Sequence, residues 1–298
     1  MLEEYMENRV FDLMKWAQRE LERSEVPCAR KDAETLLRYT LTDRDKNIYA
    51  LAGVPLPQRR LALFRHRVRL RASRFPMQYI LKNTEFMGLV FMLERGVFIP
   101  RPETELLVER VLEYINSQKQ KKRLNILEIG TGCGNIAISL TKHTSNCRII
   151  SSDISEKALR TALQNAVRHG VAKKVKFVKS NYFDGISSIY HNYFDIIVSN
   201  PPYIRSAEIR RLQPELGYED IKALDGGEDG LTAYRRILRE GIKFIKRGGL
   251  FAFEIGYDQR NDIIRMINKD GRFAKPCIFN DYNGFERILF VTYGAIKR

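Results

Sequence analysis

The sequence predicts an α/β fold in which a mostly parallel, Rossmann-like sheet follows a small helical domain. From residue 124 onward, short apolar strands alternate with amphipathic helices. The first strand ends in a glycine-rich loop, and an acidic residue closes the second. Alternation of this kind makes a parallel sheet with right-handed crossovers, and such sheets bind ligands beyond the carboxyl ends of their strands.

Residues 1–75 have the apolar spacing of helices. In the first helix the apolar side chains recur three or four residues apart, at Met6, Val10, Leu13 or Met14, Ala17 and Leu21. A second helix is predicted over 29–40. A third follows Pro55 and Pro57, with Leu61, Phe64, Val68 and Ala72 on one stripe.

The third helix is also rich in arginine. Its remaining positions hold no acid and include Arg59, Arg60, Arg65, Arg67, Arg69, Arg71 and Arg74. A solvated helix face usually mixes both signs of charge. This face therefore predicts either a partner-binding surface or a solubilising one, and the sequence leaves both open.

Residues 76–100 predict a β-hairpin linker between the helical module and the sheet. Apolar runs at 78–81, 85–87 and 90–93 surround Gly88 and suggest short strands. The chain is thus expected to have three parts: a helical domain over 1–75, the linker over 76–100 and the sheet domain over 101–298.

The sheet domain is predicted to contain five strands and four helices, and helices separate most of the strands. The strands cover 124–129, 148–153, 175–178, 194–199 and 250–255. The helices cover 136–142, 156–169, 231–245 and 259–268. The chain shows no internal repeat and no low-complexity segment.

Composition narrows the class of protein. The 298 residues carry a formal net charge of +15, which suits polyanions and acidic proteins alike as partners. No apolar run approaches the ~18 residues that a membrane-spanning helix needs. The acidic start of the chain does not resemble a secretory signal, so a cytoplasmic location is expected. The four cysteines are too dispersed for a metal site or a disulfide framework, and no metal is expected.

A glycine loop directly follows the first strand of the sheet domain. The run is Glu128-Ile129-Gly130-Thr131-Gly132-Cys133-Gly134. Its spacing differs from the dinucleotide fingerprint, and no Lys-Ser or Lys-Thr pair marks a phosphate-binding loop. An acid with Gly-x-Gly-x-Gly suits a cofactor that has an amino-acid tail and no phosphate. We therefore predict S-adenosylmethionine, held by residues 128 and 130–134.

Asp153 closes the second strand, 23 residues after Gly130. An acid at about that offset binds ribose hydroxyls in nucleoside-binding sheets. The structural alternative is that Asp153 caps the next helix, a role for which Ser155 competes. Together with the glycine loop, the position favours a ribose-binding acid.

The run Asn200-Pro201-Pro202-Tyr203 follows the fourth strand. Two prolines stiffen the backbone and end the strand, which an ordinary proline-rich turn would also do. The Asn oxygen and the first proline carbonyl can each accept one N–H of a planar amide or amine. Tyr203 can hold that planar group by its ring face. The run therefore predicts methyl transfer to a planar nitrogen, with positioning and electrostatics doing most of the work.

These motifs together resemble the HemK-type methyltransferases, and specifically the peptide chain release factor N5-glutamine methyltransferases, over nearly the whole chain. Besides the two loops, the resemblance includes residues 98–109, 223–231, 254–256 and 281–287. It implies a class I S-adenosylmethionine-dependent fold. The implied reaction is methylation of the glutamine in the Gly-Gly-Gln motif of class 1 release factors, which the helical domain would dock.

The resemblance also implies roles for individual residues. Residues 130–134, Asp153, Tyr182 and Asn200 would hold the cofactor, and residues 200–203 the glutamine amide. Asn181 stands where the family usually has an acid near the adenine. An Asn oxygen can still accept from the adenine amino group, so weaker cofactor binding is expected rather than lost activity.

Three other functions share parts of this pattern. A relative acting on a glutamine of a ribosomal protein would use the same chemistry. A nucleobase methyltransferase would need a basic, aromatic cleft beside the acceptor residues, whereas the arginine cluster lies in the N-terminal module. A docking module without catalysis would not need an intact Asn200-Pro201-Pro202-Tyr203 run. A monomer with no stable nucleic acid complex is expected.

Overall fold

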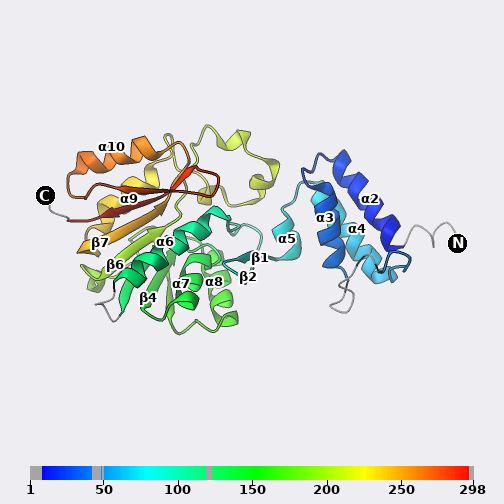
Figure 1. Cartoon of the computed structure of the whole chain (residues 1–298), viewed down its shortest axis with the longest axis horizontal. Helices are drawn as coiled ribbons and strands as arrows, with labels where there is room; N and C mark the ends of the chain where they lie inside the picture. Colours follow the sequence, from blue (N-terminus) through cyan, green and yellow to red (C-terminus); the bar gives the residue numbers. More distant parts are fainter. Residues whose placement is uncertain (1–8, 42–47, 49, 119–122, 295–298) are drawn as a thin grey trace. The chain divides into compact units, whose positions relative to one another are not determined.

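A computed structural model describes residues 9–41, 48, 50–118 and 123–294 (Figure 1). Contacts between Cα atoms divide the chain into two compact units. The helical unit comprises residues 1–83 with 213–218, and the sheet unit comprises residues 84–212 with 219–298. Within the described residues, no helix has both the length and the apolar character to cross a bilayer.

Three predicted helices of the N-terminal module are confirmed as α2 (Val10–Arg23), α3 (Ala29–Arg38) and α4 (Gln58–Ala72). The predicted stripe of α4 is buried at Leu61, Phe64 and Val68, whereas Ala72 is only partly buried. For α2 the buried side chains are Val10, Leu13, Ala17 and Leu21, while Met6 lies outside the described residues. These stripes pack together into one core, because side chains three and four residues apart share a helix face.

The arginines of α4 and of the turn after it do not form one free basic face. Arg71 is buried and donates to Asp32 at 2.7 Å and to Glu215 at 3.0 Å. Arg74 donates to Glu215 at 2.7 Å, and Arg67 donates to the Tyr39 carbonyl at 2.7 Å. Three of the seven arginines therefore stabilise the helical unit itself, which is a role that neither sequence interpretation included.

The expectation of a strand over 78–81 is wrong, because residues Met77–Leu81 form helix α5. Periodicity alone cannot distinguish a short apolar strand from a buried helical turn. Here the helix starts after Pro76, buries Tyr79 and Ile80, and ends at Lys82 in the left-handed region. The hairpin around Gly88 is confirmed as β1 (Asn83–Phe86) and β2 (Leu89–Met92).

The sheet unit is built on seven strands in the order β5-β4-β3-β6-β7-β9-β8. The five predicted strands are parallel: β3 (Leu124–Ile129), β4 (Cys147–Asp153), β5 (Val175–Lys179), β6 (Phe194–Ser199) and β7 (Ile245–Glu254). The sequence did not predict the antiparallel pair β8 (Cys277–Asn280) and β9 (Glu286–Thr292). Strand order reverses between β3 and β6, which is where such sheets bind ligands.

Helices cover both faces of this sheet (Figure 1). On one side lie α6 (Glu103–Ser117), α7 (Asn135–His143) and α8 (Glu156–Arg168). On the other lie α9 (Thr232–Gly241) and α10 (Arg260–Asp270). The sequence did not predict α6. Short 3₁₀ turns cover Ser188–Tyr190, Ile209–Arg211, Pro214–Tyr218 and Ile221–Ala223.

Glu215 is expected to stabilise the helical unit only while it is ionised. Burial acts to raise the pKa of Glu215, but hydrogen bonds from Arg74 and Arg71 outweigh it and lower the pKa to about 2. A lowered carboxyl pKa gives stability that is complete above pH 4.5, the ordinary value, and disappears as pH falls to about 2. Glu215→Gln should therefore lower the free energy of unfolding by roughly 2 kcal/mol at pH 7 and by almost nothing near pH 2.

Urea denaturation of the full chain between pH 2 and pH 7 measures this difference. Glu20→Gln is the matched control, because Glu20 pairs with Arg23 on the surface of the same unit. Such exposed pairs contribute less than about 1 kcal/mol. A difference between wild type and Glu215→Gln that did not change with pH would contradict the prediction.

Candidate active site

The predicted site residues meet at the carboxyl edge of the sheet. Residues 130–134, here called the cofactor loop, follow β3, and residues 200–203, here called the acceptor loop, follow β6. The two strands are hydrogen-bonded neighbours, so their loops emerge side by side. The Ser199 hydroxyl donates to the Ile129 carbonyl at 2.6 Å, which fastens the two strand ends together.

The cofactor loop has the backbone that its glycines predict. Gly130, Gly132 and Gly134 all have positive φ, at 84°, 55° and 87°, a region that other residues rarely adopt. A Cβ at Gly134 would also lie 2.9 Å from the Ile138 side chain. Both the positive φ and the lack of room for a Cβ require glycine at position 134.

Glu128 is a fully buried carboxyl group at the end of β3. Its Oε2 accepts hydrogen bonds from the hydroxyls of Ser151 and Thr131. Within the part of the chain that the structure describes, its Oε1 has no hydrogen-bond partner. Burial raises the pKa of Glu128 to about 8. An unpaired acceptor in such a place suits a cationic ligand group, such as the ammonium of an amino-acid tail.

Asp153 accepts one hydrogen bond from the cofactor loop and one from the backbone just before the next helix. Its Oδ2 accepts from the Gly132 N–H at 2.9 Å, and its Oδ1 accepts from the Ser155 N–H at 2.8 Å. The N-cap of α8 is Ser155, whose hydroxyl accepts from the Ala158 N–H at 3.3 Å. The helix-capping alternative for Asp153 is therefore wrong. A carboxylate has about four acceptor positions, so capacity remains for ribose hydroxyls.

The remaining predicted cofactor residues lie around these two acids. Cys133 is buried, which raises the pKa of its thiol to about 12 and keeps it unreactive. Asn181 and Tyr182 lie in the loop after β5, whose Ser180 N–H donates to the Asp153 carbonyl at 3.0 Å. The Tyr182 ring lies under the Arg236 guanidinium, at 4.6 Å from the ring centre.

Asn181 is not an acid itself, but it is hydrogen-bonded to one. Its Nδ2 donates to Asp184 at 3.1 Å, and Arg236 donates to the same Asp184 carboxylate at 2.9 Å. The loop after β5 thus still contains an acid, three residues later than in the family pattern. Weaker cofactor binding through Asn181 stays a prediction.

In the acceptor loop, Asn200 and Tyr203 are joined through one buried carboxylate. The Asn200 Nδ2 donates to Thr104 Oγ1 at 3.0 Å, and Thr104 Oγ1 donates to Glu254 at 2.6 Å. The Tyr203 hydroxyl donates to the other Glu254 oxygen at 3.3 Å. Thr104 lies in the first turn of α6 and Glu254 is the last residue of β7.

A second support holds the backbone of the acceptor loop. The buried Gln259 donates through Nε2 to the carbonyls of Tyr203 at 2.9 Å and Gly230 at 3.2 Å. A Cβ at Gly226 would lie 2.8 Å from the Tyr203 Cα. Gly226 and Gly230 therefore let residues 225–230 pack tightly against this loop.

No role was predicted for three residues of the site: Thr104, Glu254 and Gln259. Two of them lie in runs noted for their resemblance to the family, 98–109 and 254–256. A Thr or Glu in such a run carries no local signal of its partner, because each finds that partner 50 or more positions away.

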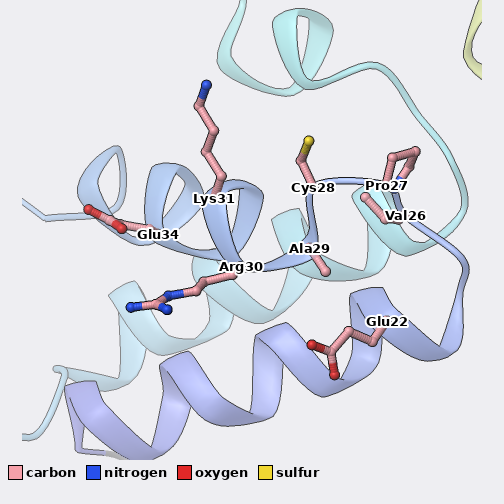
Figure 2. A pocket seen from close by; sticks show the side chains of 8 residues that line it. All are labelled: Glu22, Val26, Pro27, Cys28, Ala29, Arg30, Lys31 and Glu34. Atoms are coloured by element: carbon pink, nitrogen blue, oxygen red, sulfur yellow. The ribbon is translucent and has the colours of Figure 1, made fainter.

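A separate surface hollow lies in the helical unit and contains none of these residues. Figure 2 shows its side chains, which come from the end of α2, the start of α3 and the turn between them. They are Glu22, Val26, Pro27, Cys28, Ala29, Arg30, Lys31 and Glu34. Among the described residues, no group of three or more His, Cys, Asp or Glu side chains is arranged to hold a metal ion.

Comparison with known proteins gives the same picture. Residues 120–286 match the family described as "Methyltransferase domain", and residues 12–81 match "PrmC N-terminal domain". A "Release factor glutamine methyltransferase" of Clostridium acetobutylicum is 36% identical over 89% of this chain and 92% of its own length. One from Geobacter sulfurreducens is 35% identical over 93% of this chain and 94% of its own.

A solved structure supports the fold alone. The hMettl16 catalytic domain, in complex with an RNA hairpin, aligns with a TM-score of 0.55 at 16% sequence identity. The alignment covers 78% of this chain and 84% of that chain. A Rossmann-like methyltransferase fold is thus confirmed, and S-adenosylmethionine is the methyl donor that this class of domain uses.

Binding of S-adenosylmethionine is expected to depend on the charge of Glu128. The ionised carboxylate attracts the ligand ammonium, and below pH 8 a growing fraction of Glu128 is protonated. Relative to Glu128→Gln, we expect binding by the wild type to weaken about tenfold or more between pH 8.5 and pH 6.5. Isothermal titration with the wild type and Glu128→Gln checks this. The variant keeps only the pH dependence of the ligand itself, so parallel pH profiles of the two proteins would contradict the prediction.

Proposed function

This chain belongs to the release factor glutamine methyltransferase family, and from that premise we propose the reaction that its site performs. The protein transfers a methyl group from S-adenosylmethionine to the side-chain amide nitrogen (N5) of the glutamine in the Gly-Gly-Gln motif of class 1 peptide chain release factors. The observation that carries this proposal is the acceptor loop, whose Asn200 amide is held by Thr104.

The cofactor would lie along the edge formed by β3, β4 and β5. Glu128 has an unpaired acceptor for the ammonium, and the Asp153 carboxylate has capacity for the ribose hydroxyls. The cofactor loop lets the backbone approach closely, and residues 181–182 flank Asp153 from the neighbouring strand end. S-adenosylmethionine supplies an electrophilic methyl group on a sulfonium.

The acceptor loop would hold the glutamine amide in the plane that transfer requires. The Asn200 Oδ1 and the Pro201 carbonyl each accept one N–H of the amide, and Tyr203 packs against its face with Pro202 beside it. Both acceptors stabilise the positive charge that develops on nitrogen. The nitrogen would gain the methyl group as the methyl–sulfur bond breaks and a neutral thioether leaves. The nitrogen would afterwards lose one proton to water, so no strong general base is needed.

A nucleobase amine is the alternative acceptor, and the net charge of +15 is the observation in its favour. The basic residues of the helical unit weaken it. Arg67, Arg71 and Arg74 already donate hydrogen bonds inside that unit, which leaves fewer of their N–H groups for phosphates. A protein substrate is therefore the better supported choice. We propose that the enzyme acts in the cytoplasm, where release factors work. We also propose that it is a monomer and forms no stable complex with nucleic acid.

The proposed reaction predicts a specific loss in Asn200→Ala. Without the Oδ1 acceptor, methyl transfer should fall about hundredfold or more. The measurement is peptide mass spectrometry after incubation with a recombinant release factor and S-adenosylmethionine. It follows the 14 Da gain that one methyl group adds to the Gly-Gly-Gln glutamine. Asn146→Ala is the control, because Asn146 is exposed in the loop before β4, at the amino edge of the sheet.

Other acceptors give distinct outcomes in the same experiment. Methylation of ribosomal RNA in place of the release factor would support the nucleobase alternative. Methylation of a ribosomal protein glutamine would keep the chemistry and change the substrate. In either case the release factor proposal would be rejected.

A further inference from the structure

The hydrogen bonds behind Asn200 run in one direction. Asn200 donates through Nδ2 to Thr104, and Thr104 donates to Glu254. Thr104 and Glu254 are both 1% exposed, so water does not compete for these bonds. The three residues come from the acceptor loop, the start of α6 and the end of β7, which makes this the point where all three elements are joined.

The direction follows from what each group can donate. An ionised carboxylate accepts hydrogen bonds and donates none, whereas a threonine hydroxyl has a single hydrogen. Thr104 gives that hydrogen to Glu254, and its oxygen is left only as an acceptor. The Asn200 side chain must then present its NH₂ group to Thr104, which leaves Oδ1 on the opposite side of the amide.

We propose that Thr104 and Glu254 are positioning residues for methyl transfer, which fix the Asn200 amide so that Oδ1 faces the acceptor nitrogen. This inference rests on the proposed function. A reversed amide would present N–H groups to the N–H groups of the substrate glutamine, and two donors repel each other. Neither positioning residue touches the substrate, and each acts through side chains of the acceptor loop.

The same carboxylate also fixes Tyr203, whose hydroxyl donates to it at 3.3 Å. Around Glu254 stand Glu103 on α6 and Arg287 on β9, while the Tyr234 hydroxyl of α9 donates to the Glu254 backbone carbonyl at 2.9 Å. Burial is the main influence on the Glu254 pKa and raises it to about 7, although Thr104 and Arg287 oppose it. A protonated Glu254 can donate a hydrogen bond to Thr104. The direction of the hydrogen bonds from Asn200 to Glu254 is then no longer determined.

Thr104→Val tests the proposal with a side chain of the same shape that forms no hydrogen bond. We expect kcat/KM for methyl transfer to fall about tenfold or more, while the Kd for S-adenosylmethionine stays within about twofold of the wild type. Thr104→Ser should restore most of the activity, because it restores the hydroxyl. Thr161→Val is the matched control: Thr161 is fully buried on α8 and its Oγ1 has no partner within the described residues.

The pH profile separates positioning from mere packing. Wild-type transfer should decrease as pH falls below about 7, where Glu254 becomes protonated. At saturating S-adenosylmethionine, where weaker cofactor binding through Glu128 does not limit the rate, transfer by Glu254→Gln should be slower than by the wild type. The acidic decrease should then disappear, because the glutamine side chain does not titrate in this range. A purely structural role of Glu254 would lower the rate at every pH by the same factor.

The outcomes separate this inference from the proposed function. A wild type that leaves the glutamine unmethylated overturns both. An active wild type with a fully active Thr104→Val overturns the inference alone, and so does a Thr104→Ser variant as impaired as Thr104→Val. If the valine variant does not fold, the serine variant and the pH profile of Glu254→Gln decide the question.

Discussion

Parallel pairing of β3 with β6 is the constraint on which the site depends. Strand order reverses at this pair, so the loop after β3 and the loop after β6 leave the sheet next to each other. The Ser199 to Ile129 hydrogen bond joins the two strand ends. A one-residue change in register would point the side chains of β3 to the opposite faces. The cofactor loop and the acceptor loop therefore share one edge because of backbone pairing, before any side chain contributes.

Two buried carboxyl groups, Glu128 and Glu254, lie at this edge. Burying a carboxylate is unfavourable unless it is well hydrogen-bonded, and burial is the main cause of the raised pKa of both groups. Each of the two side-chain oxygens of Glu254 accepts one hydrogen bond, and so does its backbone oxygen. In Glu128, by contrast, the side-chain oxygen Oε1 has no partner among the described residues. The arrangement at Glu254 suits a structural support. The arrangement at Glu128 suits a binding site for a cationic ligand group.

The chain after the acceptor loop belongs in part to the helical unit. Residues 213–218 pack in that unit, where Glu215 accepts from Arg71 and Arg74. The next residue, Glu219, belongs to the sheet unit and accepts from the Ile99 N–H at 3.0 Å and from Arg101. A short covalent path thus leads from the acceptor loop to the helical unit. The arginine-rich helix α4 contains no acid, and Glu215 from this later segment supplies a carboxylate for two of the arginines.

The sequence by itself determined the parallel sheet, five of its strands, three N-terminal helices and the two loops of the site. These features follow from local periodicity and from the fixed backbone needs of glycine and proline, which neighbouring residues reveal. Only the tertiary structure decided that residues 77–81 are helical, that β8 and β9 complete the sheet, and which side chains support the site. Thr104 and Glu254 are 150 positions apart, and Arg71 and Glu215 are 144 apart. Partners at such separations are chosen by the packing of whole elements, and no local pattern records that choice.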